Sequence, residues 1–341
     1  MNRIIIISII FISLFSCNKT KKEEVKKINN EYVKLDKQAR ELFGSLELEA
    51  KNPNNVITKE KIALGKALYF EKRLSKDNTQ SCNTCHNLDT YGVDNNAFSL
   101  GNDGKLGGRN SPTTLNAAFH LSQFWDGREP DVEAQSGGPI LNPIEMAMPS
   151  EKSVIDRLSK IDMYKELFSK AFPNEKAPIT YDNLKKAIGA FERKLITPSK
   201  FDKYIAGDDK ALSNKEKKGL QTYINYGCTT CHNGSLLGGN SYQKFGVFAD
   251  YWSLTKSKNI DNGRFDFTKK EEDKYVFKVP SLRNIEKTGP YFHDGSVSNL
   301  KDAVRIMAKS QMNLNILETE VDEIITFLNT LTGEVPNELK M

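Results

Sequence analysis

One six-residue phrase occurs twice in the 341-residue sequence, as CNTCHN at residues 82–87 and as CTTCHN at residues 228–233. A Cys-x-x-Cys-His run is the attachment sequence of a c-type haem. Two cysteines three residues apart at the start of a helix present both sulfurs on one side, where they form thioethers with the porphyrin. The adjacent histidine then reaches the iron as a proximal ligand. The repeat predicts two covalently bound haem c groups, held by Cys82, Cys85 and His86 and by Cys228, Cys231 and His232.

Other uses of paired cysteines leave part of this pattern unexplained. A four-cysteine zinc site would give no role to the two histidines that follow the motifs. Disulfides between the two motifs would likewise give no role to these histidines. A redox-active dithiol is expected beside a βαβ pattern, which this sequence does not show. We therefore interpret both motifs as haem sites.

The N-terminus is typical of an exported bacterial lipoprotein. A short basic start is followed by the apolar run 4–15, which is too short to span a bilayer, and by a small residue before Cys17. This ending resembles a lipobox, in which Cys17 becomes lipidated; the alternative is an ordinary signal peptide with an incidental cysteine. Residues 18–30 are mostly Lys, Glu and Asn and have few core-forming side chains. We predict a lipoprotein signal peptide at 1–17 and a flexible tether at 18–30.

The expected location of the protein and its net charge limit the classes of binding partner that we expect. Haem attachment to this motif takes place outside the bacterial cytoplasm, which agrees with a protein anchored by lipid on the periplasmic side of a membrane. Removing residues 1–17 takes away one Arg and no acid, so the formal net charge falls from +5 to +4. So small an excess gives no reason to expect nucleic-acid binding.

The spacing of the motifs predicts the domain organisation. They lie 146 residues apart, about the length of one domain. We expect a mostly α fold with two cytochrome c-like haem domains in tandem, at residues 31–197 and 198–341, and with long ordered loops such as 95–110 and 234–240. The tail of the second domain can pack back on the first.

Helix boundaries are expected at three sets of capping residues. Thr180 is expected to cap a helix with an apolar face that ends before Pro198. Ser213 and Glu216 form a capping box before a helix that leads into the second haem motif. Thr319 and Asp322 resemble a further box, for a helix that Gly333 terminates.

From about residue 60 to Gly333 the chain resembles the bacterial di-haem cytochrome c peroxidases. The phrases that carry the resemblance stand in family order at residues 109–116, 123–128, 144–146, 201–204, 274–277, 280–284, 290–293, 300–304 and 327–331. The resemblance implies a peroxidatic haem on His86 with an open iron position. It implies an electron-entry haem on His232, with Met307 as the sixth ligand of the iron. Met312 is the alternative residue for that ligand.

The resemblance also implies roles for polar residues near these haems. Glu145 matches the carboxylate that moves a proton during peroxide cleavage. Gln135 matches an amide that polarises bound peroxide, and Trp125 matches an indole between the two haems. Packing alone is the alternative for Trp125. The implied calcium site at the domain junction consists of Asn110, Thr288 and Pro290.

The chain departs from the common family pattern at one position. Many members carry a histidine in the loop after the first haem motif, and it occupies the peroxidatic iron of the resting enzyme. The corresponding residue here is Asn102, and an amide is a poor ligand for haem iron. His120 is the remaining candidate for a distal ligand, and we interpret it instead as a packing or hydrogen-bonding residue. We therefore expect an oxidised enzyme with an open site and no need of reductive activation.

Three functions follow from the resemblance. The first is reduction of hydrogen peroxide to water with electrons from a small periplasmic cytochrome c or copper protein. The second is oxidation of protein side chains, as in the di-haem enzymes that mature a tryptophan-derived quinone. Those enzymes carry a tyrosine where this chain has Met307, which favours the peroxidase. The third is a non-catalytic di-haem electron carrier, against which Glu145 and Gln135 argue. A homodimer is also expected in this family.

Overall fold

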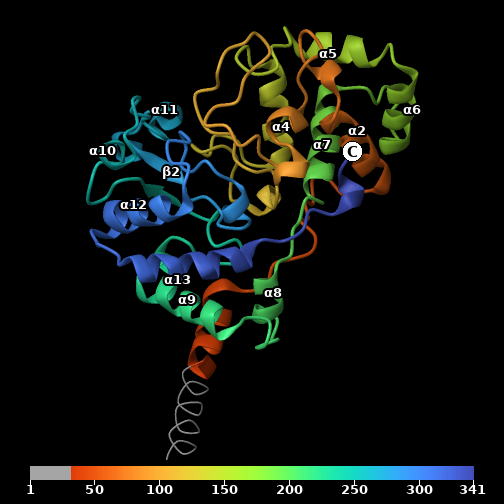
Figure 1. Cartoon of the computed structure of the whole chain (residues 1–341). Coiled ribbons are helices and arrows are strands. Elements are labelled where there is room, and N and C mark those ends of the chain that lie inside the picture. Colours follow the sequence, from red (N-terminus) through yellow and green to blue (C-terminus); the bar gives the residue numbers. More distant parts are fainter. Residues whose placement is uncertain (1–31) are drawn as a thin grey trace, which may run out of the picture.

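The computed structural model describes residues 32–341, and it is mostly helical, as expected (Figure 1). The signal peptide, Cys17 and the tether lie outside the described residues. The first half contains α2 (Lys59–Tyr69), α3 (Cys82–Cys85), α4 (Val132–Leu141), α5 (Glu151–Leu158), α6 (Asp162–Ala171) and α7 (Tyr181–Glu192). The second half contains α8 (Lys200–Ile205), α9 (Asn214–Asn225), α10 (Tyr251–Thr255), α11 (Phe265–Thr268), α12 (Leu300–Met312) and α13 (Glu318–Leu328). Within residues 32–341 no helix has the length and apolar character that crossing a membrane requires.

Strands contribute little to this fold. β1 (Tyr242–Lys244) and β2 (Val276–Lys278) pair antiparallel in a two-stranded sheet of the second half. Tyr242 pairs with Lys278 in their register. The segments expected to be loops, 95–110 and 234–240, contain no helix.

In each half, two helices cross where one of them carries a glycine. α2 packs against α7, and α9 packs against α13. A Cβ atom on Gly65 of α2 would lie 1.9 Å from the carbonyl oxygen of Ala187. A Cβ atom on Gly219 of α9 would lie 2.1 Å from the carbonyl oxygen of Glu323. The same close crossing in both halves agrees with a duplicated unit.

We expect Gly65→Ala to lower the free energy of unfolding by about 1–3 kcal/mol, because the added methyl group overpacks the crossing. Alanine in a helix interior ordinarily gains about 0.5–1 kcal/mol over glycine, so a net loss isolates the effect of the crossing. Urea unfolding of the holoprotein measures this change. Gly138→Ala is the control, since Gly138 also lies in a helix, α4 (Val132–Leu141), and its Cβ would meet only the Phe124 ring, at 3.9 Å. A Gly65→Ala protein as stable as the parent would contradict the steric argument.

Two of the three predicted helix starts are correct. The Thr180 side chain accepts a hydrogen bond from the backbone of Asn183 at the start of α7. Ser213 and Glu216 form their capping box at the start of α9. The box expected at Thr319 is wrong, because α13 begins at Glu318 and places Thr319 inside its first turn. The Glu320 carboxylate instead accepts the N–H of Leu317 at 3.1 Å.

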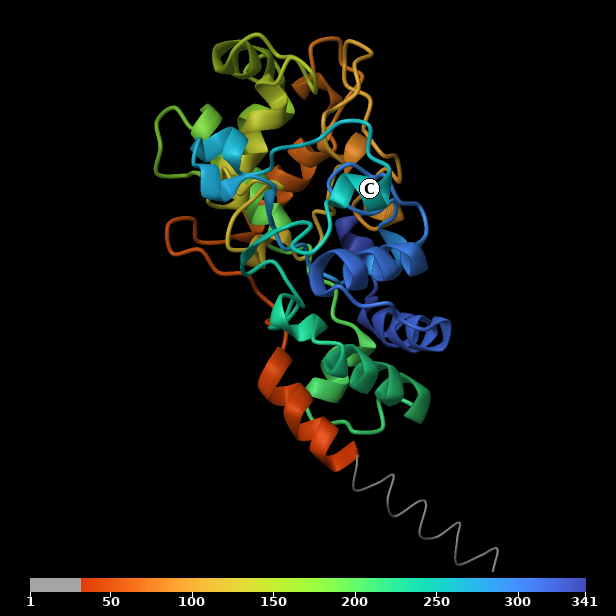
Figure 2. The same ribbon diagram turned by 90° about the vertical axis from the view of Figure 1, so that its left-hand side faces the viewer.

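Both ends of the described chain pack against the half that is more distant in sequence. The helix at residues 32–43 lies in the range 31–197 expected for the first domain, yet its apolar face packs in the core of the second half beside α8 and α9 (Figure 2). A buried ion pair fixes it there, since Lys217 donates to Asp36 at 3.0 Å. An apolar helix face needs a partner surface, and the second half supplies it.

The C-terminal residues lie on the first half. Leu339 packs with Tyr69 and Phe191, and the backbone carbonyl of Glu338 accepts a hydrogen bond from Lys66. Figure 1 shows the C-terminus beside α2.

Candidate haem sites

A cavity of about 630 Å³ collects most of the residues expected around the first haem. Its walls include the motif residues Cys82, Cys85 and His86, and also Asn110, Trp125, Gln135 and Glu145. Met307, Thr288, Pro290 and the second haem motif do not line it. The cavity therefore brings residues from the first motif, the 109–128 segment and the neighbourhood of α4 to one place.

Local hydrogen bonds shape the two motifs. The Ser81 N–H donates to the Thr84 hydroxyl at 2.9 Å, so α3 begins at Cys82. Tyr69, one turn after the crossing glycine of α2, donates its hydroxyl to the carbonyl of His86 at 2.6 Å. Tyr223, one turn after the crossing glycine of α9, donates to the carbonyl of His232 at 2.9 Å. The same tyrosine contact thus positions both motif histidines.

The motif residues fit covalent haem. All four described cysteines are free of disulfides. Burial raises the pKa of Cys228 to about 12 and raises that of Cys82 further still, which is the opposite of what a redox-active dithiol requires. Burial lowers the pKa of His86 and of His232, which favours the neutral imidazole that ligates iron.

Ring nitrogens of these histidines agree with the same assignment. Nδ1 of His232 lies 3.1 Å from the carbonyl oxygen of Leu237. A backbone acceptor at Nδ1 leaves Nε2 for a metal. Nδ1 of His86 is buried and has no hydrogen-bond partner of normal geometry among residues 32–341. The cavity, the unpaired thiols and the neutral histidine together can accommodate a porphyrin in the first half.

Glu145 is the carboxylate of the cavity. Its Oε1 accepts a hydrogen bond from the Asn142 side chain at 2.7 Å, and Oε2 has no hydrogen-bond partner among residues 32–341. Burial raises the pKa of Glu145, while the hydrogen bond from Asn142 and the charge of Arg128 partly oppose that rise. Gln135 lies on α4 and makes no side-chain hydrogen bond within the described chain, so its amide is available to a ligand.

The loop that carries Asn102 is held against the Glu145 segment. The backbone N–H of Asn102 donates to the carbonyl of Glu145 at 2.7 Å. A Cβ atom on Gly101 would lie 1.7 Å from the carbonyl oxygen of Ile144, so the two backbones are in direct contact. The Asn102 side chain contacts Asp77 and Asp103 and does not line the cavity.

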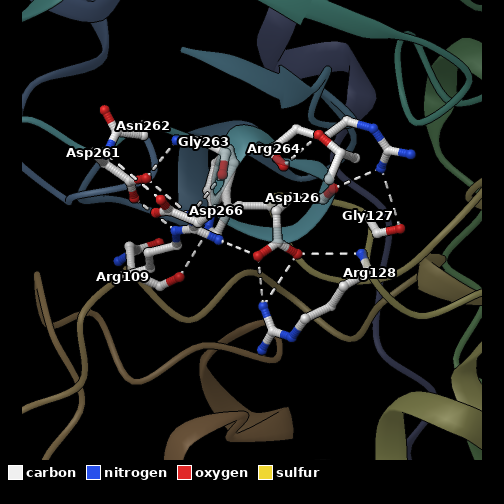
Figure 3. A network of polar contacts seen from close by, with 12 residues as sticks. Arg109, Asp126, Gly127, Arg128, Asp261, Asn262, Gly263, Arg264 and Asp266 are labelled. Carbon is white, nitrogen blue, oxygen red and sulfur yellow. Dashed lines mark hydrogen bonds and ion pairs between the residues drawn. The ribbon is translucent and has the colours of Figure 1, made fainter. Parts of the chain in front are cut away.

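An ion-pair network around Arg109 and Asp126, the residue that follows Trp125 in the sequence, joins the two halves (Figure 3). Arg109 binds Asp261 of the second half through two nitrogens, at 2.6 and 2.9 Å, and binds Asp126 at 2.6 Å. Arg264 donates to the backbone carbonyl of Asp126 at 2.8 Å. The indole N–H of Trp125 donates to the carbonyl of Asn110 at 2.9 Å, and its ring packs edge-on against His293. Trp125 therefore lies at the junction of the halves.

A structural repeat that the sequence analysis missed relates the two halves. Phe124 and Phe292 both have left-handed backbone conformations, with φ of 66° and 72°. Each lies in a loop that one isolated antiparallel bridge closes, Gln123 with Glu129 and Tyr291 with Val297. The helices that follow, α4 and α12, are capped by Asp131 and Asn299. Pro139 in α4 and Met307 in α12 follow these caps by the same number of residues. The shared F-x-D-G phrase at residues 124–127 and 292–295 was the available signal.

Met307 packs in an aromatic cluster of the second half. Its neighbours include Phe245, Tyr251 and Phe277, and it is partly buried. The structure places it on α12, away from the first cavity.

The residues expected to bind calcium lie near the domain junction. The backbone N–H of Asn110 donates to the carbonyl of His293, and its side-chain amide donates to the carbonyl of Asn96. Asn95 donates to the carbonyl of Gly289 at 2.9 Å, between Thr288 and Pro290. Residues 32–341 contain no cluster of three His, Cys, Asp or Glu side chains that could hold a metal ion.

Comparisons with known proteins agree with this arrangement. A family model described as di-haem cytochrome c peroxidase matches residues 59–210. Cytochrome c551 peroxidase of Pseudomonas aeruginosa is 44% identical over 281 residues, which cover 82% of this chain and 81% of that protein. Methylamine utilization protein MauG of Methylophilus methylotrophus is 30% identical over 294 residues, with 82% and 84% covered. The crystal structure of a MauG-like protein associated with microbial copper homeostasis has a TM-score of 0.77 at 26% identity, over 85% of this chain and 94% of that one.

These similarities extend over most of the chain. The identity to the peroxidase of Pseudomonas aeruginosa exceeds the identity to MauG over similar coverage. Two haem-attachment motifs on a duplicated helical unit agree with both relationships. The chain belongs to the di-haem cytochrome c peroxidase family.

Proposed function

We propose that this protein reduces hydrogen peroxide to water with electrons from a small cytochrome c or copper protein. The observation that carries the proposal is the cavity that Cys82, Cys85 and His86 share with Gln135 and Glu145. Proton-transfer groups beside a haem-attachment motif serve the cleavage of an oxygen–oxygen bond, whereas a simple electron carrier has no use for them.

The chemistry divides between the bound group and the protein. A haem held by Cys82, Cys85 and His86 would supply an iron to bind peroxide and a source of electrons. Reduction consumes two electrons and two protons per peroxide and yields two waters. Glu145 would take the proton from one peroxide oxygen and deliver it to the other, because water leaves far more easily than hydroxide. Gln135 would hold the peroxide by a hydrogen bond from its amide.

Met307 and Pro139 support a division of labour between the haems. A thioether ligand raises the potential of a haem, which suits the electron-entry centre on His232. The matching position in the first half is Pro139, whose ring offers no ligand atom, so the iron on His86 would keep an open site. Trp125, at the junction, is our candidate for the electron path between them.

Several finer features belong to this proposal. Asn110, Thr288 and Pro290 would bind calcium through oxygen atoms. Cys17 would carry the lipid that anchors the protein on the periplasmic side of a membrane. A homodimer would be its assembly in solution. The alternative activity, oxidation of protein side chains, is less favoured because Met307 stands where those enzymes have a tyrosine.

We expect the fully oxidised holoprotein to reduce peroxide without a lag and without prior reduction. The reason is that Asn102 is a poor iron ligand and its side chain does not line the cavity. Stopped-flow assays with reduced cytochrome c test this, with and without preincubation with the donor, and a visible spectrum of the oxidised protein should show one high-spin haem. No turnover in either assay would overturn the proposed function. Two low-spin haems with turnover only after prereduction would overturn the open-site assignment alone.

A further inference from the structure

Lys278, the last residue of β2, is a buried cation at the junction of the halves. The residue is 7% exposed. Its ammonium donates to the backbone carbonyl of Ser122 at 2.8 Å and lies 3.1 Å from Nδ1 of His120. Its backbone N–H donates to the carbonyl of Trp125 at 2.8 Å. Three contacts with the first half therefore fix the position of this second-half residue.

No carboxylate within residues 32–341 forms an ion pair with Lys278, since its two side-chain contacts are to neutral groups. Asp126 is the acid whose charge acts on it, and that carboxylate is already bound by Arg109 and Arg128. Burial lowers the pKa of Lys278 to about 7. A buried ammonium without a counter-charge is costly, so this arrangement calls for an anion that the protein does not provide.

His120 adds a second unused group at the same place. Its Nδ1 lies 3.1 Å from the Lys278 ammonium and accepts a hydrogen bond from it, which puts the proton of the neutral ring on Nε2. That Nε2 is buried and has no hydrogen-bond partner in the described chain. A buried N–H donor without an acceptor also calls for a partner.

Both side chains line the cavity that contains Cys82, Cys85 and His86. A haem carries two propionate carboxylates, and these are the anions that its binding would bring into the junction. We propose that Lys278 and His120 anchor a haem propionate, the ammonium as counter-ion and Nε2 as hydrogen-bond donor. Lys278 and His120 are thus positioning residues, and the proposal rests on the chain's holding two haems.

A propionate bound by Lys278 and His120 would link the reduction potential of its haem to the structure of the domain junction. A cation on a propionate favours the reduced haem, because it offsets negative charge near the iron. The same lysine holds the backbone of Trp125, so a propionate bound there would tie the porphyrin to the indole that lies between the halves. Either haem could supply the propionate, and the shared chemistry is the carboxylate.

The test is a pair of charge variants in the two-haem protein. We expect Lys278→Met to lower the midpoint potential of one haem, measured by spectroelectrochemical titration, while Lys278→Arg leaves it close to the parent value. Lys274→Met is the matched control, because that lysine is 40% exposed and pairs with Glu271 on the surface. A shift at the high-spin haem assigns the propionate to the Cys82 site, and a shift at the low-spin haem assigns it to the Cys228 site.

A second variant keeps the test decisive if Lys278→Met fails to fold or to load haem. His120→Phe removes the donor and keeps an aromatic ring, and we expect a smaller fall in the potential of the same haem. Unchanged potentials at both haems in either correctly loaded variant would overturn the proposal. Peroxide turnover by the parent protein is measured separately, so failure of the anchor does not count against the peroxidase function.

Discussion

Replacing Glu145 with glutamine should lower kcat for peroxide reduction by about 10²- to 10⁴-fold, the usual contribution of a positioned acid–base group. Glutamine keeps the size of the side chain and its hydrogen bond with Asn142, but it cannot accept a proton. Steady-state turnover of the holoprotein with reduced cytochrome c measures the effect. Glu151→Gln is the matched control, because that glutamate is exposed at the start of α5 and does not line the cavity. Full activity in Glu145→Gln would remove this residue from the chemistry.

The pH dependence of Glu145 provides a separate readout. The carboxylate must be ionised to accept a proton, and burial raises its pKa. The acid limb of kcat/KM should therefore lie above the pH at which an ordinary glutamate titrates, and it should vanish in Glu145→Gln. A raised pKa in the folded state means that folding favours the protonated form, so this contribution to stability is lost as pH rises through that pKa. Glu145→Gln should accordingly be no less stable than the parent at pH 7, so lost activity would not reflect unfolding.

Replacing Arg109 with leucine should lower the free energy of unfolding by about 3–5 kcal/mol, because it leaves the partly buried Asp261 carboxylate without its counter-charge and removes one of the two cations that bind buried Asp126. Asp261 loses a two-nitrogen contact, and Asp126 retains only Arg128. Burial of Asp261 works against its ionisation, and the hydrogen bond and charge of Arg109 overcome this and lower its pKa. Urea unfolding of the holoprotein at pH 7 measures the loss.

Two further variants separate the ion pair from simple loss of packing. Arg109→Leu combined with Asp261→Asn should recover part of the stability, since one stranded charge is then removed. Arg305→Leu should cause no measurable change, because its pairs with Asp302 and Glu318 are exposed. A loss for Arg109→Leu no larger than for Arg305→Leu would show that the junction network does not stabilise the fold.

Local sequence patterns predicted local structure well. Thr180 and Ser213 cap their helices as expected, because a cap is a hydrogen bond between residues within one turn of each other. The failure at Thr319 shows the limit of such patterns. The sequence is compatible with a helix that begins at either of two adjacent residues. In the structure α13 begins at Glu318, and Glu318 forms ion pairs with Lys301 and Arg305 of α12.

The candidate site could be predicted only in part. Glu145, Gln135 and Trp125 came from family phrases, and the structure places all three around one cavity with the first haem motif. The correspondence of Pro139 with Met307 was visible only after the two F-x-D-G loops were found in the same conformation. Lys278 could not be identified from the sequence, because its significance is that it forms no ion pair with any carboxylate of residues 32–341, which is a property of packing.

The sequence by itself determined the two haem attachments and the family, because thioether formation and proximal ligation require cysteine and histidine at fixed neighbouring positions. Only the tertiary structure decided that the helix at 32–43 packs on the second half, and that His120 meets Lys278, 158 residues further along the chain. The physical reason is that burial depends on which distant surfaces exclude water from a side chain. No short pattern of residues records that choice.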